Sequence, residues 1–201
     1  MRSNEEFARY IDATLLKPNV TQEDMRQHLE AARRFHFKTV AIGCAWIPYA
    51  KELLAESDVG IDAPIGFPNG YNTTAVKAFE TQQALADGAD EIDMVINLGW
   101  VKEERWDDVL GELRAVKASC RGRILKVIVE ACLLDRTEKI RLCRLITEAG
   151  ADYIKTSTGF STGGATADDV CLLRTCCPPH VKVKAAGGIA SLADAEEFIR
   201  L

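Results

Sequence analysis

The sequence of 201 residues lacks the features that mark several common classes of protein. It contains no run of about 18 apolar residues, the length that a transmembrane helix needs, and its first residues lack the apolar core of a signal peptide. Its net charge of −5 gives no general affinity for nucleic acid or anionic membranes. We therefore expect a cytoplasmic protein with no nucleic-acid and no membrane partner, in which any phosphate site is local.

Signals for metals and cofactors are also scarce. The seven cysteines form no CxxC pair and show no metal-type spacing, and the histidines at positions 28, 36 and 180 form no ligand cluster. Reduced thiols are the simpler interpretation of the cysteines. We therefore expect a protein that binds no metal and needs no cofactor.

No proline-rich, serine-rich or low-complexity linker divides the chain, and a short strand is expected from Ile11 onward. Longer apolar runs predict strands over 38–45, 60–67, 91–97, 124–130, 153–158 and 181–186. Capping sequences predict helices that start near Thr21, Asp135, Thr166 and Ser191, and an apolar stripe predicts a further helix over 102–119. The chain is thus a repeat of strand and helix.

This repeat predicts the fold. Strands and helices that alternate in steps of roughly 20–35 residues imply parallel strands with right-handed crossovers. Seven such units favour a (β/α)8 TIM barrel of the α/β class over a doubly wound sheet, and no GxGxxG motif follows the first strand. The chain ends at Leu201, before an eighth strand. We therefore expect one TIM-barrel domain over residues 1–201 that lacks the eighth β/α unit.

Strand parity predicts a polar cluster. Because side chains alternate across a strand, Asp93, Lys126, Lys155 and Lys184 lie opposite the apolar residues of four consecutive strands. The apolar face packs on the outer helices of such a barrel, so the four charged residues point to its interior or upper rim. Lysines that reach water from the strand ends would explain one of them, but they explain the joint pattern poorly. These four are candidate functional residues.

The cluster suits one kind of chemistry. A lysine with a reference pKa of about 10.4 becomes a nucleophile when burial and a neighbouring cation favour its neutral form. Lys184 is placed to be that neighbour of Lys155. A neutral lysine attacks a carbonyl to form an imine, an electron sink for carbon–carbon chemistry, and Asp93 is suited to move the proton. The pattern predicts a Schiff-base lyase or aldolase without identifying its substrate.

Two glycine-rich loops follow the lysine strands, at 159–164 and at Gly187-Gly188. Late-strand loops of barrels often bind phosphate through backbone N–H groups and a helix N-terminus, and glycine lets the backbone approach closely. Turns and helix caps also explain glycine pairs, so the glycines alone do not indicate a ligand. The position of the loops directly after the two lysine strands is what favours a phosphate site.

These and other segments carry a resemblance to one family. The segments are IDATLLKP (11–18), IGFPNG (65–70), EIDMVIN (91–97), LKVIVE (125–130), YIKTSTGFSTGGAT (153–166) and VKAAGGI (183–189). In them the sequence resembles the deoxyribose-phosphate aldolases, which are class I aldolases with a (β/α)8 barrel. The resemblance implies reversible cleavage of 2-deoxy-D-ribose 5-phosphate to acetaldehyde and D-glyceraldehyde 3-phosphate, without a cofactor, in deoxyribonucleotide catabolism.

The resemblance also implies roles for particular residues. It places the Schiff base on Lys155, the second lysine at Lys184 and the proton-transfer carboxylate at Asp93. It implies a substrate-binding set that comprises Asp12, Lys126, Thr158, Gly159, Gly187 and Gly188. A phosphosugar is then the small-molecule partner, and a homodimer is a common assembly for such enzymes.

The sequence departs from the family pattern at several places. Ala13 stands where a histidine is common, Gly43-Cys44 replaces an Asn-Pro, and Ala190 replaces an arginine. The eighth strand and its phosphate loop are absent. Two alternatives therefore stay open: a Schiff-base aldolase for another phosphosugar, and an inactive truncated barrel fragment.

Overall fold

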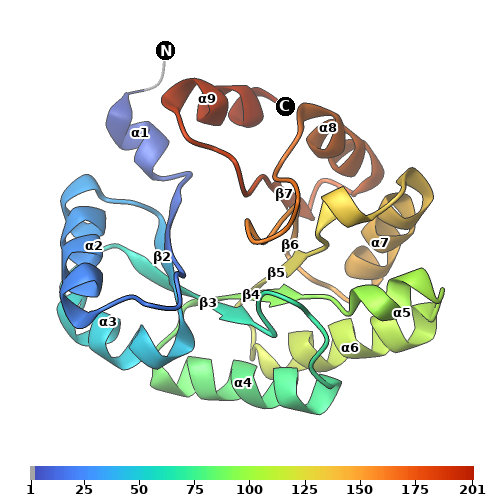
Figure 1. Ribbon diagram of the computed structural model, residues 1–201, viewed down its shortest axis with the longest axis horizontal. Coiled ribbons are helices and arrows are strands. Elements are labelled where there is room, and N and C mark those ends of the chain that lie inside the picture. Colours follow the sequence, from blue (N-terminus) through green and yellow to red (C-terminus); the bar gives the residue numbers. More distant parts are fainter. Residues whose placement is uncertain (1–2) are drawn as a thin grey trace.

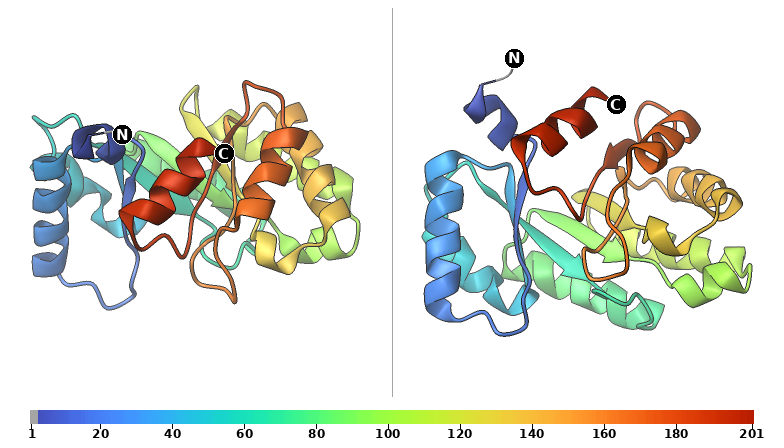
Figure 2. Two further views of the ribbon diagram at one scale, coloured as in Figure 1. Left: turned by 90° about the horizontal axis from the view of Figure 1, so that it is seen from above. Right: turned by 45° about the horizontal axis from the view of Figure 1, so that its top comes forward.

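The computed structural model describes residues 3–201, and its strands form one parallel sheet in chain order from β1 to β7. The sheet curls so that helices cover its outside, and α9 comes round toward α1 (Figures 1 and 2). The strands are β1 (Asp12–Leu15), β2 (Thr39–Ile42), β3 (Gly60–Ile65), β4 (Glu91–Val95), β5 (Ile124–Ile128), β6 (Tyr153–Lys155) and β7 (Lys182–Lys184). The predicted barrel of seven parallel strands is confirmed.

Helices fill the connections between these strands. They are α1 (Asn4–Ala8), α2 (Gln22–Phe35), α3 (Ile47–Leu53), α4 (Thr74–Asp87), α5 (Leu98–Lys102), α6 (Trp106–Ser119), α7 (Arg136–Glu148), α8 (Ala167–Cys176) and α9 (Leu192–Arg200), with short 3₁₀ turns η1 (Cys44–Trp46) and η2 (Ala131–Leu133). The four predicted starts are confirmed as N-caps, each accepting a backbone N–H three residues on. The predicted helix over 102–119 is wrong at its beginning, because Glu104 has a φ of 54° and separates α5 from α6.

The strands end earlier than the apolar runs do. The run over 124–130 predicts two more residues than β5 contains, and the chain turns at Glu130, which has a φ of 51°. The left-handed conformation is uncommon for residues other than glycine, and it is incompatible with the extended backbone of a strand. The strand therefore ends before Glu130. Polar residues after the strand are thereby held at the rim of the sheet and not within it.

The two faces of the sheet differ as strand parity predicts. Ile92 and Met94 of β4, with Leu125 and Val127 of β5, belong to the hydrophobic core that the outer helices complete. Asp93 and Lys126 alternate with them, are nearly fully buried, and make ion pairs with one another. The period of two therefore separates an outer apolar layer from a charged interior.

A Gly-Ala-Asp segment occurs twice in the chain, and its aspartate stabilises the sheet where the strands begin. Asp90 and Asp152 stand just before β4 and β6, and each follows a glycine with positive φ that ends a helix. Asp90 accepts the backbone N–H of Ile61 at 3.0 Å, and Asp152 accepts that of Leu125 at 2.8 Å. Each aspartate thus holds the beginning of the preceding strand in register.

Candidate active site

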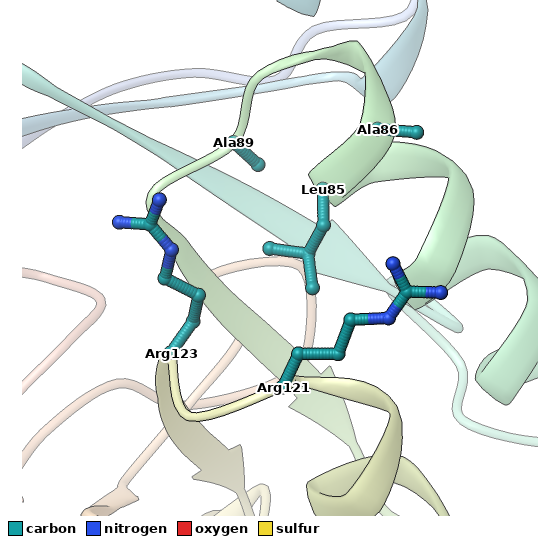
Figure 3. A pocket seen from close by; sticks show the side chains of 5 residues that line it. All are labelled: Leu85, Ala86, Ala89, Arg121 and Arg123. Carbon is teal, nitrogen blue, oxygen red and sulfur yellow. The ribbon is translucent and has the colours of Figure 1, made fainter.

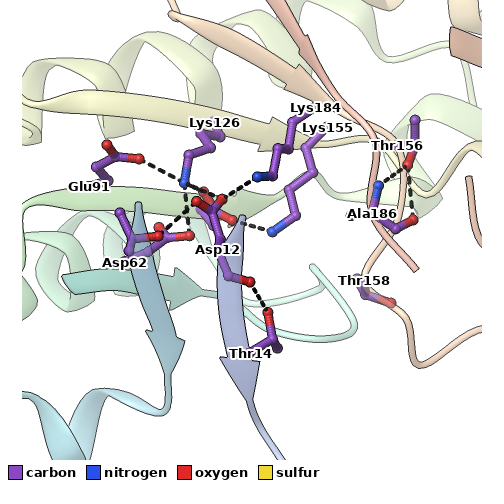
Figure 4. Close-up of polar contacts among 12 residues, drawn as sticks. Asp12, Thr14, Asp62, Glu91, Lys126, Lys155, Thr156, Thr158, Lys184 and Ala186 are labelled. Atoms are coloured by element: carbon purple, nitrogen blue, oxygen red, sulfur yellow. Dashed lines mark hydrogen bonds and ion pairs between the residues drawn. The ribbon is translucent and has the colours of Figure 1, made fainter. Parts of the chain in front are cut away.

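Charged side chains converge inside the curled sheet, and Figure 4 labels six of the residues, Asp12, Asp62, Glu91, Lys126, Lys155 and Lys184. Every strand except β2 contributes to this group of seven side chains, which comprises Asp12, Asp62, Glu91, Asp93, Lys126, Lys155 and Lys184. The register explains the convergence, because Asp93 lies opposite Lys126 and Lys155 lies opposite Lys184 on neighbouring strands. Paired residues point to the same side of a sheet.

Lys126 is the centre of this interior cluster, defined as the seven side chains above. Its Nζ lies within reach of four carboxylates, at 2.8 Å from Asp62, 2.9 Å from Glu91, 3.0 Å from Asp93 and 3.3 Å from Asp12. Burial disfavours the Lys126 ammonium, but the four carboxylates outweigh it and raise its pKa well above the usual range. The Lys126 ammonium is thus the cation that these four carboxylates surround.

Lys155 pairs with Asp93. Its Nζ donates to Asp93 Oδ2, and both side chains are nearly buried. Burial lowers the pKa of Lys155, yet Asp93 and Asp62 prevail over burial and over the repulsion from Lys126, so the pKa is raised. The prediction that Lys155 is kept neutral is therefore wrong for this structure.

Lys184 lies opposite Lys155 on the neighbouring strand, as strand parity predicts, but its ammonium group is paired with other residues. Its Nζ lies 2.8 Å from Asp12 Oδ2 and donates to the backbone carbonyl of Tyr10 at 3.2 Å. It thereby joins β7 to β1, the two end strands of the sheet. Asp12 thus balances the charge of Lys184, a partner that the sequence-based prediction did not include.

The carboxylates Asp12 and Asp93 remain ionised. Burial raises the pKa of each, but Lys184 and Lys126 hold the pKa of Asp12 far below its usual range, and Lys155 and Lys126 lower that of Asp93. Thr39 also donates to Asp12 at 2.8 Å. The interior thus presents anionic oxygens directly beside the Lys155 ammonium.

The two glycine-rich loops meet above the end of β6. Ala165 N donates to Gly187 O at 3.1 Å, and a Cβ added at Gly164 would lie 2.3 Å from that same oxygen. Gly159 and Gly188 both have positive φ, at 81° and 77°. Close approach and left-handed backbone are the reasons for glycine here, and the predicted neighbours are brought together.

Glu130 holds the first of these loops. Thr158 donates from its hydroxyl to Glu130 Oε2 and from its backbone N–H to both Glu130 oxygens at 3.3 Å. The Thr158 hydroxyl in turn accepts the N–H of Phe160 at 3.1 Å. The Thr158 side chain therefore shapes the loop through its contacts with Glu130 and Phe160. Its contact with substrate stays a prediction.

A family model described as DeoC/LacD family aldolase matches residues 7–201. The chain belongs to this aldolase family. It is 51% identical over 191 residues to the deoxyribose-phosphate aldolase of Streptococcus suis (strain 98HAH33), with 95% of this chain and 87% of the relative covered. It is 47% identical over 196 residues to the deoxyribose-phosphate aldolase of Metamycoplasma hominis, with 98% and 90% covered.

A solved structure agrees with these relatives. The tetrameric deoxyribose phosphate aldolase of Aeropyrum pernix matches with a TM-score of 0.87 and 34% identity, covering 98% of this chain and 84% of that chain. The predicted resemblance is confirmed, and so is the predicted enzyme class, an aldolase. For a DeoC/LacD family aldolase, the interior lysines at the rim of a parallel barrel lie where enzymes of this architecture carry their active sites.

Two members of the interior cluster were missed by the sequence-based prediction. Glu91 shares the parity of Asp93 on the same strand, so the alternation that identified Asp93 could have found it. Asp62 interrupts the apolar run over 60–67, and a single carboxylate in a buried strand was its available signal. Glu130, which holds the loop, gave no signal that distinguishes it from a strand-end residue.

A surface hollow lies at the other end of the sheet (Figure 3). Its lining comprises Leu85, Ala86, Ala89, Arg121 and Arg123. These residues precede β4 and β5, whereas the lysine cluster and the glycine loops lie toward the strand ends. Arg123 already lies 3.8 Å from Asp90, an ion pair that belongs to the strand-starting device described above. The hollow is thus separate from the candidate active site.

No described helix is both long and apolar enough to cross a membrane. No group of three or more His, Cys, Asp or Glu side chains in the described chain is arranged to hold a metal ion.

Proposed function

We propose that the chain reversibly cleaves 2-deoxy-D-ribose 5-phosphate to acetaldehyde and D-glyceraldehyde 3-phosphate through a Schiff base on Lys155. The observation that carries this proposal is the contact between the Lys155 ammonium and the Asp93 carboxylate inside an aldolase-family barrel. The curated relatives are named deoxyribose-phosphate aldolase, and they match almost all of this chain at about 50% identity. These names support the proposed substrate.

The chemistry follows from these groups. After Lys155 loses a proton, its Nζ attacks the aldehyde carbon of the open-chain sugar, and loss of water gives a cationic imine. A base then takes the proton of the C3 hydroxyl, the C2–C3 bond breaks, and its electron pair neutralises the imine as an enamine. Protonation of the enamine at C2 and addition of water release acetaldehyde and restore Lys155. Asp93 is placed to accept and return these protons.

The resting ion pair fits this course. The Lys155 ammonium and the imine that replaces it carry the same positive charge, so Asp93 Oδ2 faces a cation in both states. The raised pKa of Lys155 makes the neutral amine costly, but the cluster is already arranged for the cationic imine. Oriented charges that do not need to reorganise lower a barrier most effectively.

Trapping with borohydride tests the proposal. Reduction in the presence of 2-deoxy-D-ribose 5-phosphate should fix a stable adduct on the peptide that carries Lys155, and Lys155→Met should abolish both the adduct and the activity. Lys182→Met is the matched control, because Lys182 lies on the neighbouring strand and stacks on the Tyr153 ring. An adduct on another lysine in the active enzyme, or full activity of Lys155→Met, would contradict the assignment.

The same proposal places the sugar phosphate against the two glycine loops. Gly188 has positive φ and no atom within 4 Å of an added Cβ, so a small side chain there points into open space. Gly188→Asp should raise KM for the phosphorylated sugar relative to Gly188→Asn, because aspartate repels phosphate and asparagine does not. Both variants should act equally on 2-deoxy-D-ribose. A shared loss on both sugars would place the phosphate elsewhere.

We also propose that the chain works in the cytoplasm and self-associates. All seven cysteines are free thiols, which suits a reducing compartment. The Aeropyrum pernix relative is a tetramer, and Tyr71 and Phe79 expose 73% and 67% of their surface on this chain. Light scattering on the purified protein, compared with Phe79→Asp, would measure the assembly.

A further inference from the structure

Asp62 is a fully buried carboxyl group on β3 that no step of the proposed reaction uses. Its Oδ2 accepts from Lys126 Nζ at 2.8 Å (Figure 4). Its Oδ1 makes no hydrogen bond to any described residue. Asp93 Oδ1 and Asp12 Oδ2 also make none, but they lie 3.0 and 2.8 Å from the ammonium groups of Lys126 and Lys184. Asp62 Oδ1 therefore requires an explanation, since a buried carboxyl oxygen costs free energy unless it is paired.

The charges of the interior cluster do not balance. Four carboxylates face three ammonium groups, which leaves one surplus negative charge in a largely buried region. An uncompensated buried charge is strongly unfavourable, so such a group binds a proton instead. One proton on one carboxylate makes the cluster neutral.

The contacts indicate which carboxylate carries the proton. Asp12 contacts both Lys126 and Lys184, and Asp93 contacts both Lys126 and Lys155. Asp62 makes one ion-pair contact, with Lys126. Glu91 also has one such contact, but its side chain keeps some access to solvent, with 9% exposed against 0% for Asp62.

We propose that Asp62 is a neutral carboxylic acid that donates a hydrogen bond to Asp93 and thereby positions Asp93 and sets its proton affinity. A proton on Asp62 Oδ1 that bridges to Asp93 Oδ1 satisfies the Asp62 oxygen and adds a hydrogen bond to an Asp93 oxygen that already lies 3.0 Å from the Lys126 ammonium. Asp62 acts through Asp93 and touches no reacting atom, so it is a positioning residue. The proposal rests on the function proposed above for Asp93 and Lys155.

The electrostatics of every strand that faces Asp62 agree with this assignment. Burial raises the pKa of Asp62 well above its usual range, and the charge of Asp93 raises it further. Lys126 and Lys155 act in the opposite direction without prevailing, and Asp12 on β1 adds a smaller increase. After the larger effects of burial and of the two lysines, a hydrogen bond from Asp62 lowers the pKa of Asp93.

Two substitutions separate a neutral acid from a carboxylate. Asp62→Asn keeps a neutral group that accepts from Lys126 and donates to Asp93, so kcat/KM and the acid limb of its pH profile should stay near wild type. Asp62→Leu removes the donor to a charged group, so kcat/KM should fall about 10- to 100-fold and the acid limb should move to higher pH. An ionised Asp62 predicts the opposite for Asp62→Asn, a clear loss and an acid limb at lower pH.

An infrared measurement reads the proton directly. The protein labelled with ¹³C-aspartate should show a carboxylic-acid C=O band at neutral pH that is missing in Asp62→Asn. Absence of this band in the wild type would overturn the proposal, and this result holds even if Asp62→Leu fails to fold.

The two proposals fail separately. The infrared band and the titration of Asp62 need no turnover, whereas borohydride trapping on Lys155 needs no particular state of Asp62. A missing adduct with an intact band would overturn the proposed function alone, and an adduct on Lys155 without the band would overturn the role of Asp62 alone.

Discussion

The protein buries two lysine centres, and they differ in kind. Inside the sheet, Lys126 meets four carboxylates, and its pKa is raised. Outside the sheet, Lys77 of α4 pairs with Glu112 of α6 at 2.8 Å and donates to Val95 O at 2.7 Å, and both side chains are fully buried. Burial outweighs Glu112 there and lowers the pKa of Lys77, while the pKa of Glu112 is raised.

The difference separates a structural ion pair from a site. The Lys77–Glu112 pair has one charge of each sign, and Glu112 also accepts the N–H of Asn97 at 3.2 Å, so its groups are satisfied and hold the end of β4 against two helices. The interior cluster has a surplus carboxylate and an unsatisfied Asp62 oxygen. A buried lysine alone does not indicate function, whereas an unbalanced set that faces a rim does.

The largest expected contrast is in activity after matched amide substitutions. Asp93→Asn should lower kcat/KM by about 10²–10⁴-fold, because it removes the group that moves protons beside Lys155. Glu112→Gln should leave kcat/KM of the folded enzyme near wild type. Steady-state kinetics with 2-deoxy-D-ribose 5-phosphate would measure both, and equal losses would erase the distinction between the two centres.

Stability should respond most to the structural pair. Lys77→Met leaves Glu112 buried without its partner, and it should lower the free energy of unfolding by about 3–5 kcal/mol in urea titrations. Lys102→Met is the matched control, because Lys102 pairs with Glu138 at the surface and its loss should cost less than about 1 kcal/mol. A small effect of Lys77→Met would show that the pair is not a structural support.

The pH dependence of stability should have opposite signs in the two regions. Asp12 has a lowered pKa when folded, so its contribution is present above its unfolded value of about 3.9 and is lost as the pH falls. Glu112 has a raised pKa, so its contribution is present below about 4.3 and is lost as the pH rises.

Each group changes the slope by at most about 1.4 kcal/mol per pH unit. Asp12→Asn should therefore flatten the acid side of the stability profile, and Glu112→Gln should flatten the decline toward neutral pH. Unfolding in urea from pH 3 to pH 8 measures both slopes, and slopes of the same sign would refute the contrast.

The smallest change is expected when both members of the structural pair are replaced. Lys77→Met combined with Glu112→Leu removes both charges together, and the free energy of unfolding should lie within about 1 kcal/mol of wild type. The corresponding exchange inside the sheet, Lys126→Met with Asp62→Leu, leaves three carboxylates without their central cation and should not recover. Recovery of both double variants would mean that the interior cluster is another structural support.

The faces of the strands and the beginnings of the helices could be predicted from the sequence, because both depend on patterns that repeat over a few residues. Alternation along 91–97 and 124–130 assigned Asp93 and Lys126 to one face, and the four capping sequences fixed where helices begin. Local rules of this kind act over two to four residues, so they do not depend on how the sheet closes.

The charge partners could not be predicted in this way. Lys184 pairs with Asp12 and Lys126 with Asp62, partners that are far apart in sequence and meet because of the curvature of the sheet. From the sequence alone, burial and Lys184 favour a neutral Lys155, and the carboxylates that reverse this lie on other strands. Lys77 shows the converse case, because it lies on a helix where lysines are normally solvated.

The contact of Lys184 with Tyr10 O and Asp12 has a consequence for how the molecule responds to its ligands. This one ammonium links the first strand to the last, and the resemblance to the aldolases implies that the same side chain belongs to the active site. A ligand that draws Lys184 to itself must weaken that link, and by reciprocity a tighter link must weaken the ligand. Substrate should therefore speed hydrogen exchange at the backbone amides of β1 while it slows exchange in the glycine loops, so that one edge of the sheet loosens as the other tightens.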